Sequence, residues 1–123
     1  QRQYNTISIS ILDDYFASIA LEEKNSIALR NFEIMRKGYS ILEEWVNSEL
    51  FIDCVLPHGG TTALIRYKKD IPSRDFARNL QRSTGVATLP GETLEMEGYL
   101  RIGYCADNLK PALDLISEFI REI

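Results

Sequence analysis

The sequence predicts a two-layer α/β sandwich of the α+β type, in which a small antiparallel or mixed sheet carries helices on one face. Two observations lead to this fold class. Apolar residues recur with a helical period up to about residue 50, and beyond it short β-rich segments alternate with helical ones. The expected order of elements is α-α-β-β-α-β-β-α. With 123 residues, the chain has the length of one domain.

Composition narrows the class of protein. Hydrophobic residues make up 45% of the chain and charged residues 26%, and the net charge is −4, so disorder is not expected. No run approaches the roughly 20 apolar residues that span a bilayer, and the first residues lack the apolar core of a signal peptide. We therefore expect a cytoplasmic protein with no membrane partner. Because it does not begin with Met, we expect a processed or truncated piece of something longer.

Cysteine and histidine content argues against a structural zinc site, because two cysteines and one histidine would need carboxylates to complete it. We expect Cys54 and Cys105 to be half-buried thiols in a reducing cytosol. A disulfide between them is open only to a fold that brings their Cα atoms within about 7 Å.

The first expected helix begins at a capping box. Residues 10–13 have its Ser-x-x-acid form, and Asp13 and Asp14 place negative charge in the first turn, where the helix dipole favours it. Helical spacing predicts one apolar face that is made of Leu12, Phe16, Ile19 and Ala20.

The second expected helix covers about residues 23–47. Gly38 lies in its middle, where it costs about 1 kcal/mol relative to Ala and would allow a neighbouring element to approach closely. This apolar stripe is longer than a small domain usually needs, so part of it is expected to dock on a missing partner domain. Its members recur at spacings of four and three residues: Ala28, Phe32, Met35, Tyr39, Leu42 and Val46.

The second half predicts four strands and two helices. Strands are expected over residues 51–56, 61–67, 86–89 and 99–104, with a turn at residues 58–60. Between the second and third strands, Ser73 is the expected N-cap of a helix that Gly85 ends. Asp107 or Asn108 is expected to cap the terminal helix. Its inward residues are expected to be Leu113, Ile116, Ile120 and Ile123.

Most candidate functional residues have an ordinary structural interpretation. His58 has no Ser, Cys or carboxylate close in sequence to complete a triad, and we expect an exposed turn residue. The segment His58-Gly59-Gly60-Thr61 lacks the spacing of a phosphate loop, so a hairpin turn is expected. Arg74, Arg78 and Arg82 share one helix face and could contact phosphates, but the chain is acidic and a solvated face is expected.

Arg101 stands apart from the other charged residues, because it lies inside an apolar strand. Strand alternation places Leu100 and Ile102 on one face and Arg101 on the other, with Tyr99 and Gly103. Gly103 leaves space beside it. A guanidinium in such a place is suited to hold a planar carboxylate with two parallel N–H bonds, although a solvated or ion-paired arginine is the alternative.

Three segments together resemble the C-terminal small domain of class I/II aminotransferases, the fold-type I enzymes that use pyridoxal 5′-phosphate. They are GVATLPG at residues 85–91, YLRIGY at residues 99–104 and the closing amphipathic helix; PHGG at residues 57–60 resembles the family's strand entry. The family commonly has an aromatic residue after Pro-Gly, where this chain has Glu92-Thr93-Leu94. Thr93 stands eight residues before Arg101, so the arginine does not follow a cofactor lysine as in the family's phosphate-binding motif.

The resemblance implies a fragment of an aminotransferase of amino acid metabolism. By analogy, Arg101 binds the α-carboxylate of an amino acid or 2-oxo acid, residues 1–48 supply interdomain helices, and residues 49–123 form the sandwich. No lysine of the chain has the context of the Schiff-base lysine, so pyridoxal phosphate is expected on a missing large domain before Gln1, and the chain alone is expected to be inactive. The resemblance further implies a homodimer of the full-length enzyme.

A second function class stays open. The chain is alternatively a free-standing α/β protein- or nucleic-acid-interaction module. It would recognise a partner through the long helix or through Arg74, Arg78 and Arg82, although nucleic acid is not the expected partner of an acidic chain.

Overall fold

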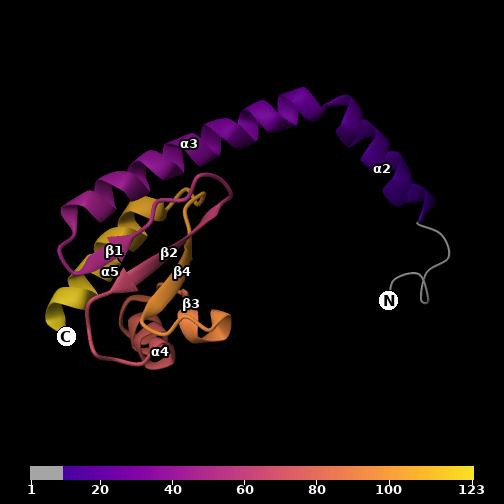
Figure 1. Cartoon of the computed structure of the whole chain (residues 1–123). Coiled ribbons are helices and arrows are strands. Elements are labelled where there is room, and N and C mark those ends of the chain that lie inside the picture. Colours follow the sequence, from indigo (N-terminus) through magenta and orange to yellow (C-terminus); the bar gives the residue numbers. More distant parts are fainter. Residues whose placement is uncertain (1–9) are drawn as a thin grey trace. The chain divides into compact units, whose positions relative to one another are not determined.

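The computed structural model describes residues 10–123 and confirms the predicted fold class and element order (Figure 1). By compactness the chain divides into two units, one ending at Glu33 and one from Ile34 to Ile123. The elements are α2 (Ile11–Glu22), α3 (Lys24–Ser48), β1 (Ile52–Cys54), β2 (Thr62–Tyr67), α4 (Ser73–Thr84), β3 (Leu89–Pro90), the 3₁₀ helix η1 (Gly91–Leu94), β4 (Tyr99–Gly103) and α5 (Leu109–Glu122).

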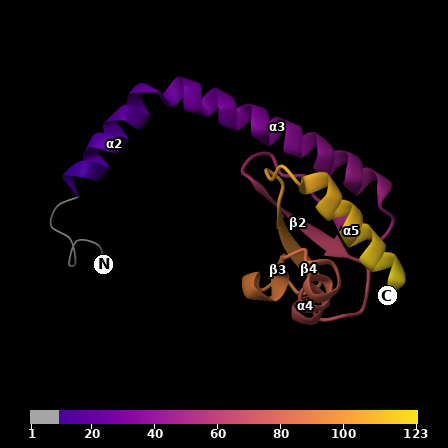
Figure 2. The same cartoon turned by 180° about the vertical axis from the view of Figure 1, so that it is seen from behind.

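The sheet has the strand order β1-β2-β4-β3, and every neighbouring pair is antiparallel. Along β2 and β4, residues alternate between the inward and the outward face of the sheet: on β4, Leu100 and Ile102 are buried and Arg101 is exposed. Helices α4 and α5 cover the inward face, as the two opposite views show (Figures 1 and 2). Burial of this face supplies the main driving force for folding, at about 25 cal/mol per Å² of apolar surface.

The last part of α3 packs into the same core. Leu42 is fully buried, and Trp45 donates its indole N–H to the hydroxyl of Ser117 on α5 over 2.8 Å. At the helix end, the buried carboxylate of Glu49 pairs with Arg121 at 2.7 Å. These two polar links fix α3 against α5, because each satisfies a polar group that burial removes from water.

Gly38 allows the close approach that the sequence predicts. A methyl group at this position would overlap the carbonyl oxygen of Tyr104, just after β4. The glycine is buried, and the helix backbone therefore lies directly against the chain that leaves β4. The helix accepts the weaker propensity of glycine at this turn because no larger residue fits.

Apolar residues of α2 and of the start of α3 are exposed in the structure. Leu12, Phe16 and Ile19 on α2, and Phe32 on α3, are 63%, 64%, 40% and 66% exposed. No residue of α2 is buried, so the structure does not distinguish the predicted apolar face from the other sides of this helix. Ser10 is the N-cap of α2, yet its side chain makes no cap hydrogen bond.

Three further differences concern element ends. The strand predicted over residues 86–89 is present only as β3, Leu89–Pro90, because the segment after Gly85 does not pair with β4. Of the two predicted cap residues, Asn108 is the N-cap of α5, as expected, but its side chain makes no cap hydrogen bond. Ile123, expected to point inward, is 45% exposed because α5 ends at Glu122.

Candidate functional site

Arg101 lies in the middle of β4 and points away from the core. Its chain neighbours Leu100 and Ile102 are 0% and 6% exposed, whereas Arg101 lies on the face of the sheet that α4 and α5 leave open. In the register of the sheet, Arg101 stands opposite Leu64 of β2 on one side and Leu89 of β3 on the other. The predicted placement of Arg101 is confirmed.

The surroundings of Arg101 leave its guanidinium available. Among residues 10–123, no carboxylate lies within ion-pair distance of Arg101. A Cβ on Gly103, two residues along the strand, would have only the carbonyl oxygen of Thr61 nearby, at 3.9 Å, so the space beside the arginine is open. An arginine fixed on a rigid strand between two leucines has the chemistry to hold a planar anion with two N–H bonds.

The loop that leads into β4 is anchored on α4. Ser73 is fully buried, and its backbone N–H and its hydroxyl both donate to the carboxylate of Glu97, the hydroxyl over 2.7 Å. The same hydroxyl accepts the N–H of Gly98 over 2.9 Å. The backbone N–H of Ser73, with help from its hydroxyl, lowers the pKa of Glu97. A carboxylate thus caps the positive end of the α4 dipole.

This arrangement corrects the predicted helix cap. Pro72, not Ser73, is the N-cap residue of α4, and Ser73 is the first helical residue. The cap comes from Glu97, which lies 24 residues further along the chain. The sequence contains an acidic residue before β4, but a contact between residues so far apart has no local pattern from which it could be predicted.

The other candidate residues are an exposed turn histidine and the arginines of α4. His58 is exposed in the turn before β2, where Gly60 adopts a φ of 89°, as the hairpin prediction requires. On α4, Arg74 makes a two-pronged contact with Glu92 at 3.0 Å, and Arg78 pairs with Asp75 at 3.5 Å. Two of the three arginines in the predicted stripe are therefore occupied by carboxylates.

The two cysteines are free and half-buried, as predicted. Burial raises the pKa of both thiols, so each stays protonated and weakly reactive at neutral pH. Within the part of the chain from Ser10 onward, no three His, Cys, Asp or Glu side chains come together as a metal site. Over the same residues, no helix has both the length and the apolar character to cross a membrane.

The lysines from Lys24 onward are either exposed on helices or in contact with neighbouring groups. Lys24, Lys37 and Lys110 are exposed on helices. Lys68 is held by Asp53 at 2.9 Å and by the carbonyl of Leu50, and Lys69 lies over the ring of Phe51.

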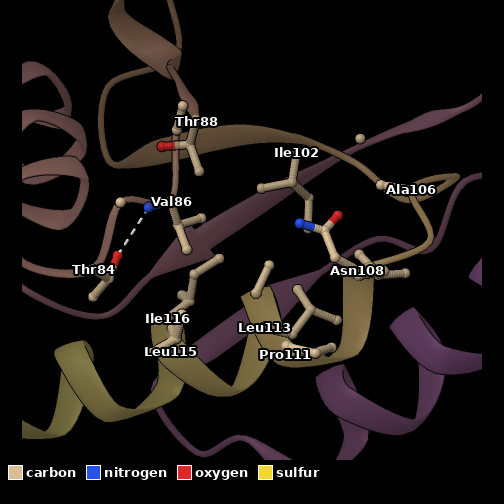
Figure 3. A pocket seen from close by; sticks show the side chains of 15 residues that line it. Thr84, Val86, Thr88, Ile102, Ala106, Asn108, Pro111, Leu113, Leu115 and Ile116 are labelled. Carbon is tan, nitrogen blue, oxygen red and sulfur yellow. Dashed lines mark hydrogen bonds between the residues drawn. The ribbon is translucent and has the colours of Figure 1, made fainter.

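A cavity of about 380 Å³ lies on the other side of β4, against α5 (Figure 3). Val86, Ile102, Leu113 and Ile116 form its apolar wall, and the Asn108 amide points toward it. The hydroxyl of Thr84 accepts the N–H of Val86 over 3.1 Å at one end. Sequence reasoning did not predict this cavity, because it forms where residues 85–88 turn away from β4 instead of extending β3. Arg101 does not line this cavity.

Known proteins resemble the chain in sequence and in fold. Capreomycidine synthase of Streptomyces vinaceus is 31% identical over 120 residues, which cover 95% of this chain and 31% of that protein. A PLP-dependent aminotransferase from Streptococcus suis 89-1591 is 30% identical with a TM-score of 0.93, over 98% of this chain and 33% of that one. No family model matches the chain.

Two more solved structures extend the likeness. Aspartate aminotransferase from Thermotoga maritima is 25% identical with a TM-score of 0.75, over 97% of this chain and 31% of its own. A PLP-dependent cyclase has a TM-score of 0.89 at 21% identity, over 98% of this chain and 34% of its own, which shows a common fold. The chain spans about a third of the length of these relatives.

Fold and sequence together confirm the resemblance to fold-type I pyridoxal-phosphate-dependent enzymes. The proteins that the chain resembles include aminotransferases as well as a cyclase and a synthase, and the chain matches about a third of each.

Proposed function

We propose that this chain is the small-domain lobe of a pyridoxal-phosphate-dependent enzyme that acts on amino acids, and that Arg101 binds the α-carboxylate of the substrate. The observation that carries the proposal is the position of Arg101: exposed at the centre of the open sheet face, with no carboxylate in ion-pair distance among residues 10–123. Its match to the strand arginine of the resembling family supports the same role. Charge-assisted, two-pronged binding would orient the substrate for reaction.

Amino-group transfer between an amino acid and a 2-oxo acid is the reaction we propose first. The likeness to the Streptococcus suis aminotransferase, at 30% identity and a TM-score of 0.93, supports it. A reaction on an amino acid without transfer of its amino group is the second candidate, which the 31% identity to capreomycidine synthase favours. Both reactions need the α-carboxylate to be held, so the role of Arg101 is common to them.

The cofactor would be held by the rest of the longer enzyme. When bound there, pyridoxal phosphate supplies the electron sink for reactions at the substrate's α-carbon. The chain contributes Arg101, which binds the substrate carboxylate. The Ser73–Glu97 contact joins the loop before its strand to α4. Residues 1–48 are proposed to connect the lobe to that remainder. The exposed apolar residues of α2 and of the start of α3 support this role, because an exposed apolar surface is typical of a site that contacts another protein segment.

The experiment compares this chain with the longer protein that its gene encodes. We expect the longer protein, but not the 123-residue chain, to develop the absorbance of a lysine-bound cofactor after addition of pyridoxal phosphate. The longer protein is then mixed with an amino acid in the absence of a 2-oxo acid. Release of one equivalent of 2-oxo acid supports transfer, and a modified amino acid without any 2-oxo acid supports the second candidate. Cofactor bound by the 123-residue chain alone would contradict the proposal that the rest of the longer enzyme holds the cofactor.

A further inference from the structure

A second arginine lies on the open face of the sheet that carries Arg101. On β2, Ile65 and Tyr67 are buried, whereas Arg66 between them is exposed. The register pairs Arg66 with Tyr99 and Leu64 with Arg101. The two arginines are therefore diagonal neighbours on adjacent strands, a relation that puts residues about 7–8 Å apart, within reach of long side chains.

The two residues that stand opposite the arginines on the neighbouring strands have apolar side-chain surfaces. Leu64 and Tyr99 are both half-buried, and each stands directly opposite one of the arginines. An elongated molecule that touched both guanidinium groups would therefore lie across an aliphatic side chain and an aromatic ring. Such a floor suits the methylene groups between two acidic groups.

The charges around Arg66 leave it without an acidic partner. Its cross-strand neighbour on β1 is Asp53, but that carboxylate is bound by Lys68 at 2.9 Å. Among residues 10–123, neither Arg66 nor Arg101 has a carboxylate within 4.0 Å. Two neighbouring positive charges repel each other, and an anion that contacts both relieves the repulsion.

Space is available beside Arg66. A hollow of about 520 Å³ lies between the end of α3 and β1, and its wall includes Arg66, Tyr99 and Lys68 as well as the carboxylates Glu49 and Asp53. Arg101 does not line this hollow. A molecule bound to Arg101 by one end thus has room to extend past Tyr99 toward Arg66.

We propose that Arg66 binds a second acidic group of the substrate, so that the enzyme prefers amino acids and 2-oxo acids with a carboxylate on the side chain. This inference rests on the proposed function of Arg101, and it names the substrate class for that site. Arg101 holds the α-carboxylate, Leu64 and Tyr99 support the methylene groups, and Arg66 selects the acidic end.

The test measures kcat/KM of the longer, cofactor-loaded enzyme for glutamate and for glutamine, which differ in charge but hardly in size. Arg66→Gln is expected to lower kcat/KM for glutamate at least 10-fold and to leave that for glutamine within 2-fold. Inhibition by glutarate should weaken in the same variant. Arg101→Gln is expected to lower both values, and Arg82→Gln, on an exposed arginine of α4, to change neither.

The outcomes separate this inference from the function on which it rests. An unchanged glutamate-to-glutamine ratio in Arg66→Gln, with both values lowered in Arg101→Gln, would overturn the inference and leave the proposed function standing. A wild-type enzyme that does not prefer glutamate to glutamine would overturn it as well. Full activity of Arg101→Gln on both substrates would overturn the proposed function itself. Thermal unfolding and cofactor absorbance of each variant verify that it is folded.

Discussion

Ser73 at the start of α4 and Glu97 before β4 form a two-point contact, in which one carboxylate accepts both the backbone N–H and the hydroxyl of one serine. The contact joins the helix layer to the loop that precedes the strand of Arg101. Because Ser73 is fully buried, its N–H would otherwise lie at a helix end without a partner. The start of β4 is therefore fixed by a group outside the sheet.

Acid should weaken the fold through this contact. The pKa of Glu97 is lowered in the folded chain, mainly by the N–H of Ser73, so the ionised form stabilises the fold above the unfolded pKa of about 4.3. This contribution is lost as the pH falls from there through the lowered pKa. Denaturant unfolding from pH 7 to pH 3 is expected to be less pH-dependent in Glu97→Gln. Glu95→Gln, at an exposed residue of the same loop, should keep the wild-type dependence, and an identical profile for both variants would contradict the prediction.

Gly38 provides a test of packing between α3 and the end of β4. Gly38→Ala would place a methyl group against the carbonyl oxygen of Tyr104 and should lower the free energy of unfolding by about 1–3 kcal/mol, despite the better helix propensity of Ala. Gly59→Ala is the matched control, because a Cβ at Gly59 meets nothing within 4 Å. Urea unfolding measures both. A Gly38→Ala variant as stable as Gly59→Ala would show that this close approach is absent.

The ion pair between Glu49 and Arg121 should matter more than the exposed pairs. The side chain of Glu49 is only 3% exposed, so Arg121→Gln leaves a buried carboxylate without its charged partner. We expect a loss of about 1–3 kcal/mol in the free energy of unfolding. Arg78→Gln removes an exposed pair with Asp75 and should cost no more than about 0.5 kcal/mol. Equal losses in the two variants would contradict this ranking.

The apolar surface of the first helices should control how the chain behaves outside the longer enzyme. Phe16 and Phe32 are 64% and 66% exposed. Replacing both with Glu is expected to raise the solubility of the 123-residue chain, and to impair assembly or cofactor loading of the longer enzyme. Sedimentation and cofactor absorbance measure the two effects. The control is Val55→Glu, because Val55 is 90% exposed, whereas Phe51 packs on the core. Normal assembly and cofactor loading of the longer enzyme with both replacements would contradict the claim that the rest of the enzyme covers this surface.

Local patterns were sufficient to predict most of the fold. Alternation on β4 placed Leu100 and Ile102 inside and Arg101 outside, and Gly85 ends α4 in a left-handed conformation, φ 79°, as a helix-ending glycine should. The open position of Arg101 followed from the same alternation. The presence of a glycine at residue 38 of a long helix correctly predicted a close neighbour.

Contacts between distant residues account for what the sequence did not predict. The serine expected to cap α4 instead binds Glu97, and the segment at residues 86–88 leaves the sheet, so β3 shortens to Leu89–Pro90. Helical spacing on α2 predicted an apolar face, but no residue of α2 is buried. The diagonal placement of Arg66 and Arg101 depends on strand register, which the sequence alone did not specify.

The most direct test of the central claim is the effect of Arg101→Gln on kcat/KM of the longer, cofactor-loaded enzyme for its best amino acid. Loss of two charge-assisted hydrogen bonds to the α-carboxylate predicts a decrease of about 100-fold, which corresponds to about 3 kcal/mol, with normal cofactor absorbance and thermal unfolding. Competition by a simple monocarboxylate should weaken in parallel. A kcat/KM within 2-fold of the wild-type value, in a folded and loaded variant, would contradict the assignment of Arg101 to the substrate carboxylate.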